Sequence, residues 1–83
     1  MSKSKPISID NVDKYVQLGL NIAYYRKLLG YSQEQLAEKA GISRTHLSMI
    51  EAPNIIKSFS LELLFDIAAA LQLDSYKLLI FRD

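Results

Sequence analysis

The chain has 83 residues, of which 49% are hydrophobic and 23% charged, proportions typical of one small folded domain rather than of a disordered or membrane-spanning chain. Ten Lys and Arg residues against nine Asp and Glu residues leave a formal charge of +1, so the overall charge does not by itself indicate a polyanionic partner. The lack of Cys and the presence of a single His, His46, exclude the usual thiolate and imidazole metal sites. We therefore expect no metal and no cofactor. No small-molecule ligand is expected either, because we expect no sensor domain beside the single folded domain.

No apolar run approaches the ~20 residues needed to cross a bilayer, and the polar start of the chain lacks the apolar stretch of a secretory signal. We therefore expect a cytoplasmic protein that does not contact the membrane. Residues 1–11 are predicted to form a flexible N-terminal tail, because the segment begins with polar residues and shows no periodicity. Residues 12–83 are predicted to form one domain.

The first predicted helix runs from Val12 to Leu29, where apolar residues recur at spacings of three and four. The residues that set this pattern are Tyr15, Leu18, Ile22, Tyr25 and Leu29. Gly19 is a weak point inside the helix, because glycine is a poor helix former. Gly30 is predicted to end the helix.

Four further helices are predicted from one repeated starting signal. An apolar residue precedes each candidate N-cap residue, and a second apolar residue follows four positions after the cap. The candidate caps are Ser32, Ser43, Ser60 and Asp74, and Gln35 completes a capping box with Ser32. The predicted helices are Gln33–Ala40, Arg44–Glu51, Leu61–Leu71 and Ser75–Phe81. No stretch alternates with the period of two that marks a strand, so the predicted fold class is all-α, with five helices around one core.

Two of these helices, within residues 32–51, are joined by the short turn Gly41-Ile42-Ser43. Gly41 fits the left-handed conformation that often follows a helix. The small side chains of Ala37 and Ala40 allow the two helices to approach closely. This is the layout of a helix-turn-helix, in which the second helix enters the major groove of DNA.

The same segment carries a family resemblance in the sequence SQEQLAEKAGISRTHLSMIE, residues 32–51. It resembles the lambda-repressor/Cro-like (XRE-type) helix-turn-helix family, and the resemblance covers roughly residues 18–80. The resemblance implies a five-helix, lambda-repressor-like DNA-binding domain that usually acts as a dimer on a two-fold operator. Two departures flank the 52–59 segment: Pro53 stands where the family usually has Gly, and Phe59 stands where it usually has Pro.

The second helix of the motif has one face suited to reading bases. Leu47 and Ile50 are predicted to face the core. The side chains expected to project toward DNA are Arg44, Thr45, Ser48 and Met49. Arginine can bind guanine O6 and N7 together, hydroxyl groups can bond to several base edges, and Thr and Met can touch a thymine methyl group. A face that is merely solvated is the alternative interpretation, and the motif favours DNA readout.

Phosphate contacts are predicted at the start of the motif and beside its second helix. Gln33 lies in the first turn of its helix, where free backbone N–H groups and the helix dipole favour an anion. The other candidates for phosphate contact are Ser43, His46 and Lys57. Arg26 and Glu51 resemble a family pair that forms a partly buried structural salt bridge, which would leave Arg26 unavailable to DNA.

The last predicted helix carries more apolar surface than a small core uses. Leu78 and Phe81 are enough to reach the core, which leaves Tyr76, Leu79 and Ile80 without an assigned contact. Such a segment usually has a partner, and a two-fold contact between two copies matches an operator built from two half-sites. Complete burial within one copy is the alternative.

Together these features predict a homodimeric, sequence-specific transcriptional regulator that binds double-stranded DNA and acts as a repressor. The alternative is an antitoxin-like protein-interaction module of the same fold, whose DNA binding is secondary. An enzyme is not expected, because the sequence shows neither a Gly-rich phosphate loop nor a nucleophile–base pair.

Overall fold

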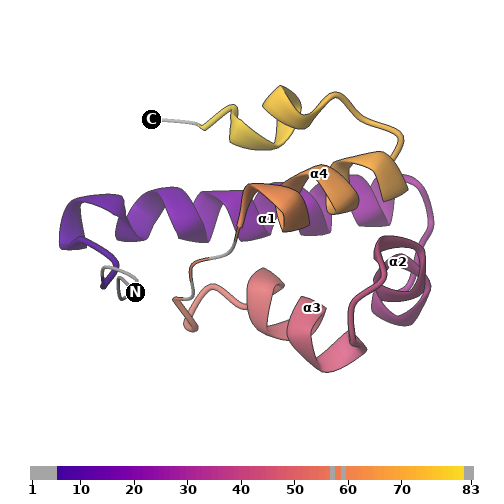
Figure 1. Ribbon diagram of the computed structural model, residues 1–83, viewed down its shortest axis with the longest axis horizontal. Helices are drawn as coiled ribbons and strands as arrows, with labels where there is room; N and C mark the ends of the chain where they lie inside the picture. Colours follow the sequence, from indigo (N-terminus) through magenta and orange to yellow (C-terminus); the bar gives the residue numbers. More distant parts are fainter. Residues whose placement is uncertain (1–5, 57, 59, 82–83) are drawn as a thin grey trace.

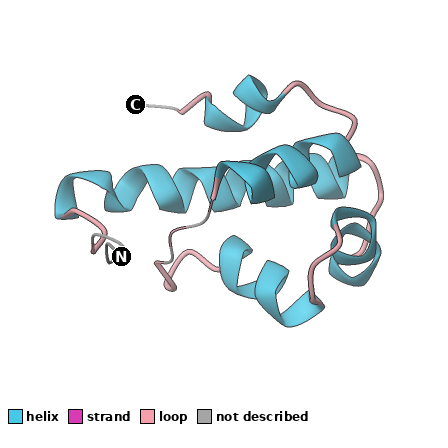
Figure 2. Ribbon diagram, in the orientation of Figure 1, coloured by secondary structure: helices cyan, strands magenta, loops and turns pink. Residues whose placement is uncertain are grey.

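Helices make up all the regular structure of the part of the chain that the structure, a computed structural model, describes: residues 6–56, 58 and 60–81 (Figure 2). In chain order the elements are η1 Ile9–Asn11, α1 Val12–Leu28, α2 Gln33–Ala40, α3 Arg44–Glu51, α4 Leu61–Ala70 and η2 Ser75–Leu79, where η marks a 3-10 helix. The prediction of an all-α fold is confirmed. None of the described helices is both long and apolar enough to span a membrane.

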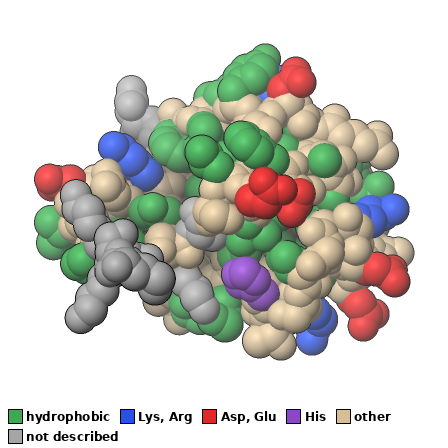
Figure 3. All heavy atoms as spheres, in the orientation of Figure 1, with side chains coloured by type: hydrophobic (Ala, Val, Ile, Leu, Met, Phe, Trp, Pro, Cys, Tyr) green, Lys and Arg blue, Asp and Glu red, His purple; other side chains and the backbone are tan. Residues whose placement is uncertain are grey.

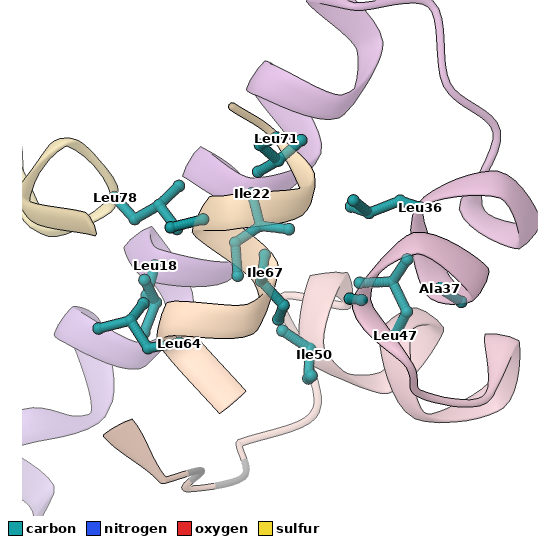
Figure 4. Packing of buried hydrophobic residues seen from close by; sticks show 12 residues of the cluster. Leu18, Ile22, Leu36, Ala37, Leu47, Ile50, Leu64, Ile67, Leu71 and Leu78 are labelled. Carbon is teal, nitrogen blue, oxygen red and sulfur yellow. The ribbon is translucent and has the colours of Figure 1, made fainter. Parts of the chain in front are cut away.

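The long helix α1 is the centre of the molecule (Figure 1). α4 packs in front of it, the C-terminal segment lies above both helices, and α2 and α3 lie toward the bottom and right of the view. One apolar core joins these elements, and its largest fully buried side chains are Ile22, Leu36, Leu47, Ile67, Leu71 and Leu78. Figure 4 shows side chains from every α-helix and from η2 converging on this core.

Three of the four predicted N-caps are present. The Ser32 hydroxyl accepts a hydrogen bond from the Gln35 backbone N–H at 3.0 Å, and the Gln35 side chain accepts one from the Ser32 N–H at 2.8 Å, which completes the predicted capping box. Ser43 and Ser60 cap α3 and α4 in the same way, each accepting from the backbone N–H three residues later. The predicted helix starts at residues 33, 44 and 61 are therefore correct.

The prediction for the C-terminal segment was wrong in two respects. Asp74 makes no side-chain capping bond, and the segment is a 3-10 helix over Ser75–Leu79 rather than an α-helix that continues to Phe81. The physical reason lies in α1, where the Asn21 side-chain amide donates hydrogen bonds to the carbonyl groups of Leu78 and Ile80 at 2.9 and 3.1 Å. These contacts satisfy the end of the segment from outside, so no further helical turn is needed there.

The N-terminal segment contains a short helix that the sequence did not predict. Residues 9–11, assigned to the tail in the sequence analysis, form the 3-10 helix η1, and the Ser8 hydroxyl accepts a hydrogen bond from the Asp10 N–H at 3.2 Å. α1 then begins at Val12, as predicted. Residues 1–5 of the predicted tail lie outside the described residues.

Two glycines determine how the helices meet. Gly41 has φ +76°, the left-handed conformation expected of it, and it ends α2 immediately before the turn into α3. Gly19 is buried where α1 crosses the end of α3, and a Cβ atom at this position would overlap the backbone carbonyl oxygen of Ile50. The predicted weak point in α1 is therefore the place where the backbones of α1 and α3 come closest.

Candidate nucleic-acid interface

The two faces of α3 differ as the sequence predicts. Leu47 and Ile50 are buried in the core, at 0% and 8% exposure. On the other side Arg44, Thr45 and Ser48 are exposed, whereas Met49 is only half-buried. Three of the four predicted base-reading side chains therefore project into solvent, and Met49 offers part of its surface.

The N-terminal ends of α2 and α3 are placed side by side. A shallow polar recess between them is lined by Arg26, Ser32, Gln33, Glu34 and Arg44. The backbone N–H groups in the first turn of a helix have no partner within the helix, and the dipole adds positive potential there. The recess thus combines the Arg44 guanidinium with a helix N-terminus, an arrangement suited to an anion such as a phosphate group.

An ion pair fixes α3 to α1. The Arg26 Nε atom lies 2.8 Å from Glu51 Oε2, and Arg26 Nη2 donates to Glu51 Oε1 at 3.0 Å, so the contact is bidentate. The two side chains are 11% and 5% exposed. Arg26 Nη1 also donates to the Tyr31 carbonyl at 2.8 Å, which ties the same guanidinium to the turn before α2. Arg26 and Glu51 therefore hold α1, α2 and α3 in one arrangement, the structural role expected of them.

The Gln33 side chain makes a contact within the protein that the sequence did not predict. Its side-chain Nε2 donates to Glu51 Oε1 at 3.0 Å, and the residue is half-buried. The sequence predicts only a phosphate contact for Gln33, because Gln33 and Glu51 are 18 positions apart and no local pattern links them. The pattern that could have indicated it is the resemblance that pairs Glu51 with Arg26, since a buried carboxylate has room for more than two donors.

The other three residues predicted to contact phosphate differ in hydrogen bonding and in exposure. The Ser43 hydroxyl accepts a hydrogen bond from the backbone N–H of His46 at 3.0 Å, and this cap leaves its own O–H as a donor for an anion. The His46 side chain is half-buried. Lys57 lies outside the described residues. Among the described residues there is no cluster of three or more His, Cys, Asp or Glu side chains that could hold a metal ion.

Helices α2 and α3 are joined by a short turn that begins with the left-handed Gly41. One face of α3 is buried against the core and the other face is polar and exposed. This arrangement defines a helix-turn-helix domain. Residues 22–78 match the helix-turn-helix family, and the chain belongs to that family, in its lambda-repressor/Cro-like (XRE) branch. This membership agrees with the resemblance noted in the sequence.

Known proteins similar to this chain are regulators of transcription or of restriction-modification. The chain is 39% identical over 66 residues to the HTH-type transcriptional regulator SinR of Bacillus licheniformis, a match that covers 80% of this chain and 59% of SinR. The crystal structure of SinR, the master regulator for biofilm formation, in complex with DNA is 40% identical, with a TM-score of 0.70 over 76% of this chain and 98% of that one. The restriction-modification controller protein C.AhdI of Aeromonas hydrophila is 27% identical, with a TM-score of 0.74 over 80% and 97%. This chain thus spans about three fifths of the length of the curated SinR relative.

Proposed function

We propose that this chain binds double-stranded DNA sequence-specifically as a homodimer and regulates transcription as a repressor, rather than catalysing a reaction. The observation that carries the proposal is the arrangement of α3, which is fixed on its inner side by the core and the Arg26–Glu51 pair and exposes a polar outer side. A rigid helix of eight residues with an exposed Arg and two hydroxyl groups fits the major groove. Similarity to SinR, whose structure includes DNA, supports the same assignment.

The polar recess between α2 and α3 supports an accompanying phosphate contact. It lies at the N-terminal ends of both helices, on the side from which Arg44 projects. Phosphate contacts set the register of a protein on DNA, and side chains on base edges then read the sequence. In this proposal Arg44, Thr45, Ser48 and the exposed part of Met49 read bases, while the start of α2 holds the DNA backbone.

The direct test is selection of bound sequences from a pool of random duplexes, with the whole chain as the binding protein. We expect enrichment of a consensus with two-fold symmetry, because two copies present two equivalent α3 helices to two half-sites. A pool that shows no enrichment after repeated rounds would contradict sequence-specific binding, and an enriched single half-site would contradict the dimer.

Replacing Arg44 with Ala is expected to cost about 1–3 kcal/mol of binding free energy per half-site on the selected duplex and to relax the preference at one base position. Arg44→Lys is the matched control, because it keeps the charge but loses the planar fork that binds guanine at two points. Binding isotherms on selected and scrambled duplexes should show Lys restoring the affinity for the scrambled duplex only. If Lys restored both affinities, Arg44 would contact the DNA backbone rather than a base.

The exposed apolar residues of the C-terminal segment support the dimer. Tyr76, Leu79 and Ile80 are 61%, 46% and 58% exposed, so the core does not cover them. Figure 3 shows hydrophobic side chains over α4 and the C-terminal segment, with acidic side chains among them. Apolar surface of this kind indicates a partner.

The position of α3 limits where two copies can meet. Figure 1 places the C-terminal segment and α3 on opposite sides of α1 and α4. Two copies that bind one DNA duplex must leave both α3 helices uncovered. A hollow of about 270 Å³ between α1, α4 and the C-terminal segment does not include α3, and Leu61, Leu79 and Phe81 line it. We therefore place Leu79 at the centre of the two-fold contact.

Leu79→Glu is expected to shift the protein to a monomer in sedimentation and to weaken binding to a two-fold operator by about 10²–10⁴, because the second half-site no longer gains from linkage. Leu20→Glu on α1 is the matched control, since Leu20 is 48% exposed and does not line the hollow. It should leave both the mass and the affinity unchanged. A wild-type chain that sediments as a monomer at high micromolar concentration would overturn the dimer.

A further inference from the structure

The Asn21 side chain, in the middle of α1, holds the end of the C-terminal segment. Its amide donates to the Leu78 carbonyl at 2.9 Å and to the Ile80 carbonyl at 3.1 Å, so each of its two N–H groups has an acceptor. Asn is a poor helix former, and helix propensity alone does not favour it inside α1. The contact with a segment 57 to 59 residues further along the chain gives it a role there.

The two bonded carbonyl groups lie on either side of Leu79 in the chain. Leu78, before it, is fully buried and fixes the segment to the core (Figure 4). Ile80, after it, has the extended backbone (φ −84°, ψ 105°) at which the 3-10 helix ends. Leu79 itself is 46% exposed and lines the hollow beside α1 and α4. The Asn21 amide therefore fixes the backbone around the residue that the proposed function places at the centre of the two-fold contact.

We propose that Asn21 is a positioning residue for dimer formation: it holds residues 78–80 in the conformation that presents Leu79 to a second copy of this chain. The last carbonyl groups of a helix have no partners within the helix, and the chain beyond them is free to move unless it is held. With Asn21 in place this freedom is lost before two copies meet, so association does not have to remove it. This inference rests on the proposed function and extends it, because it names the residue of α1 that controls the strength of the dimer.

The expected consequence is a loss of dimer affinity without a loss of the fold. Leu78 stays in the core whether or not the amide is present, and Asn21 itself is only half-buried. The position of α3 depends on other contacts, namely the core and the Arg26–Glu51 pair. A chain without the Asn21 amide should therefore bind a single DNA half-site as before and bind its second copy more weakly.

The experiment compares Asn21→Leu, which has a side chain of similar size but no donor, with Asn54→Leu. Asn54 is the matched control because it is an exposed Asn between α3 and α4. Sedimentation equilibrium gives the dimer dissociation constant of each chain, and a duplex with one half-site gives the affinity of a single copy. Thermal unfolding shows whether each variant folds, and Asn21→Ala replaces Asn21→Leu if the latter does not.

We expect Asn21→Leu to raise the dimer dissociation constant by about 10- to 100-fold, because both copies must then order the backbone around Leu79 on association. The half-site affinity should stay within about twofold of the wild type, and Asn54→Leu should leave both quantities nearly unchanged. An unchanged dimer dissociation constant for Asn21→Leu would overturn this inference, and so would an equal loss of half-site affinity. A wild-type chain that is a monomer would instead contradict the proposed function.

A double-mutant cycle tests whether Asn21 acts through Leu79. Leu79→Ala weakens the contact by itself, and once the Leu79 side chain is gone its presentation no longer matters. Asn21→Leu should therefore change the dimer dissociation constant at least about threefold less in the Leu79→Ala background than in the wild type. Equal effects in the two backgrounds would mean that Asn21 contributes to the dimer independently of Leu79, and the proposal would be wrong.

Discussion

Glu51→Leu is expected to destabilise the domain by about 3–5 kcal/mol, because it leaves the buried Arg26 guanidinium without its counter-ion. Glu51 accepts three hydrogen bonds, two from Arg26 and one from Gln33, and its side chain is only 5% exposed. The Arg26–Glu51 pair is buried, so it is not comparable to solvent-exposed ion pairs, which contribute about 0–1 kcal/mol to stability. Urea denaturation monitored by circular dichroism measures the change.

A double variant separates the net contribution of the ion pair to the free energy of unfolding from the cost of leaving one buried charge unpaired. Arg26→Met combined with Glu51→Leu removes both charges, and it should be more stable than Glu51→Leu alone, since no unpaired charge remains buried. Glu38→Ala on the exposed side of α2 is the control and should change the free energy of unfolding by less than about 0.5 kcal/mol. If Glu51→Leu matched this control, the ion pair would not hold α3 in place.

Gly19→Ala is expected to destabilise the domain by about 1–3 kcal/mol, the cost of overpacking a closely packed contact. The sign of the change in the free energy of unfolding is what tests this prediction. Helix propensity alone gives Ala an advantage of about 1 kcal/mol over Gly inside a helix. In the structure, however, the added Cβ meets the backbone carbonyl of Ile50, which cannot move aside as a flexible side chain can.

Thermal unfolding of Gly19→Ala beside Lys27→Ala measures this effect, because Lys27 is an exposed residue of the same helix. Lys27→Ala should leave the melting temperature nearly unchanged. A Gly19→Ala variant more stable than the wild type would mean that α1 and α3 can separate at no cost. Weaker DNA binding together with lower stability is expected, because the same contact sets the position of α3.

The sequence predicted the starts of three helices correctly from signals that lie within a few residues. The caps at Ser32, Ser43 and Ser60 each bond to an N–H three positions away, and the starts of α2, α3 and α4 follow from them. The facing of Leu47 and Ile50 follows from the period of 3.6 residues. Asp74 shows the limit of such signals: it has the same local pattern, and no cap forms there.

The contacts of Gln33 and Asn21 and the role of Gly19 were not predictable in this way. Gln33 and Glu51 are 18 residues apart, and Asn21 reaches carbonyl groups 57 and 59 residues away. Each of these contacts depends on how whole helices pack. A sequence pattern predicts on which face of its own helix a side chain lies. It does not predict which atom of another helix that side chain contacts.

The sequence by itself determined the bounds of α1, α2, α3 and α4 within a residue or so, the helix-turn-helix and its family, and which side of α3 is buried. These features arise from hydrogen bonds within one turn and from the burial of apolar stripes, both of which are encoded locally. Only the tertiary structure decided that Gly19 is a point of backbone contact, that Gln33 binds Glu51, and that the C-terminal segment is a 3-10 helix held by Asn21. The physical reason is that helices pack as rigid bodies, so the partner of a polar group or the space beside a glycine is set by residues far along the chain.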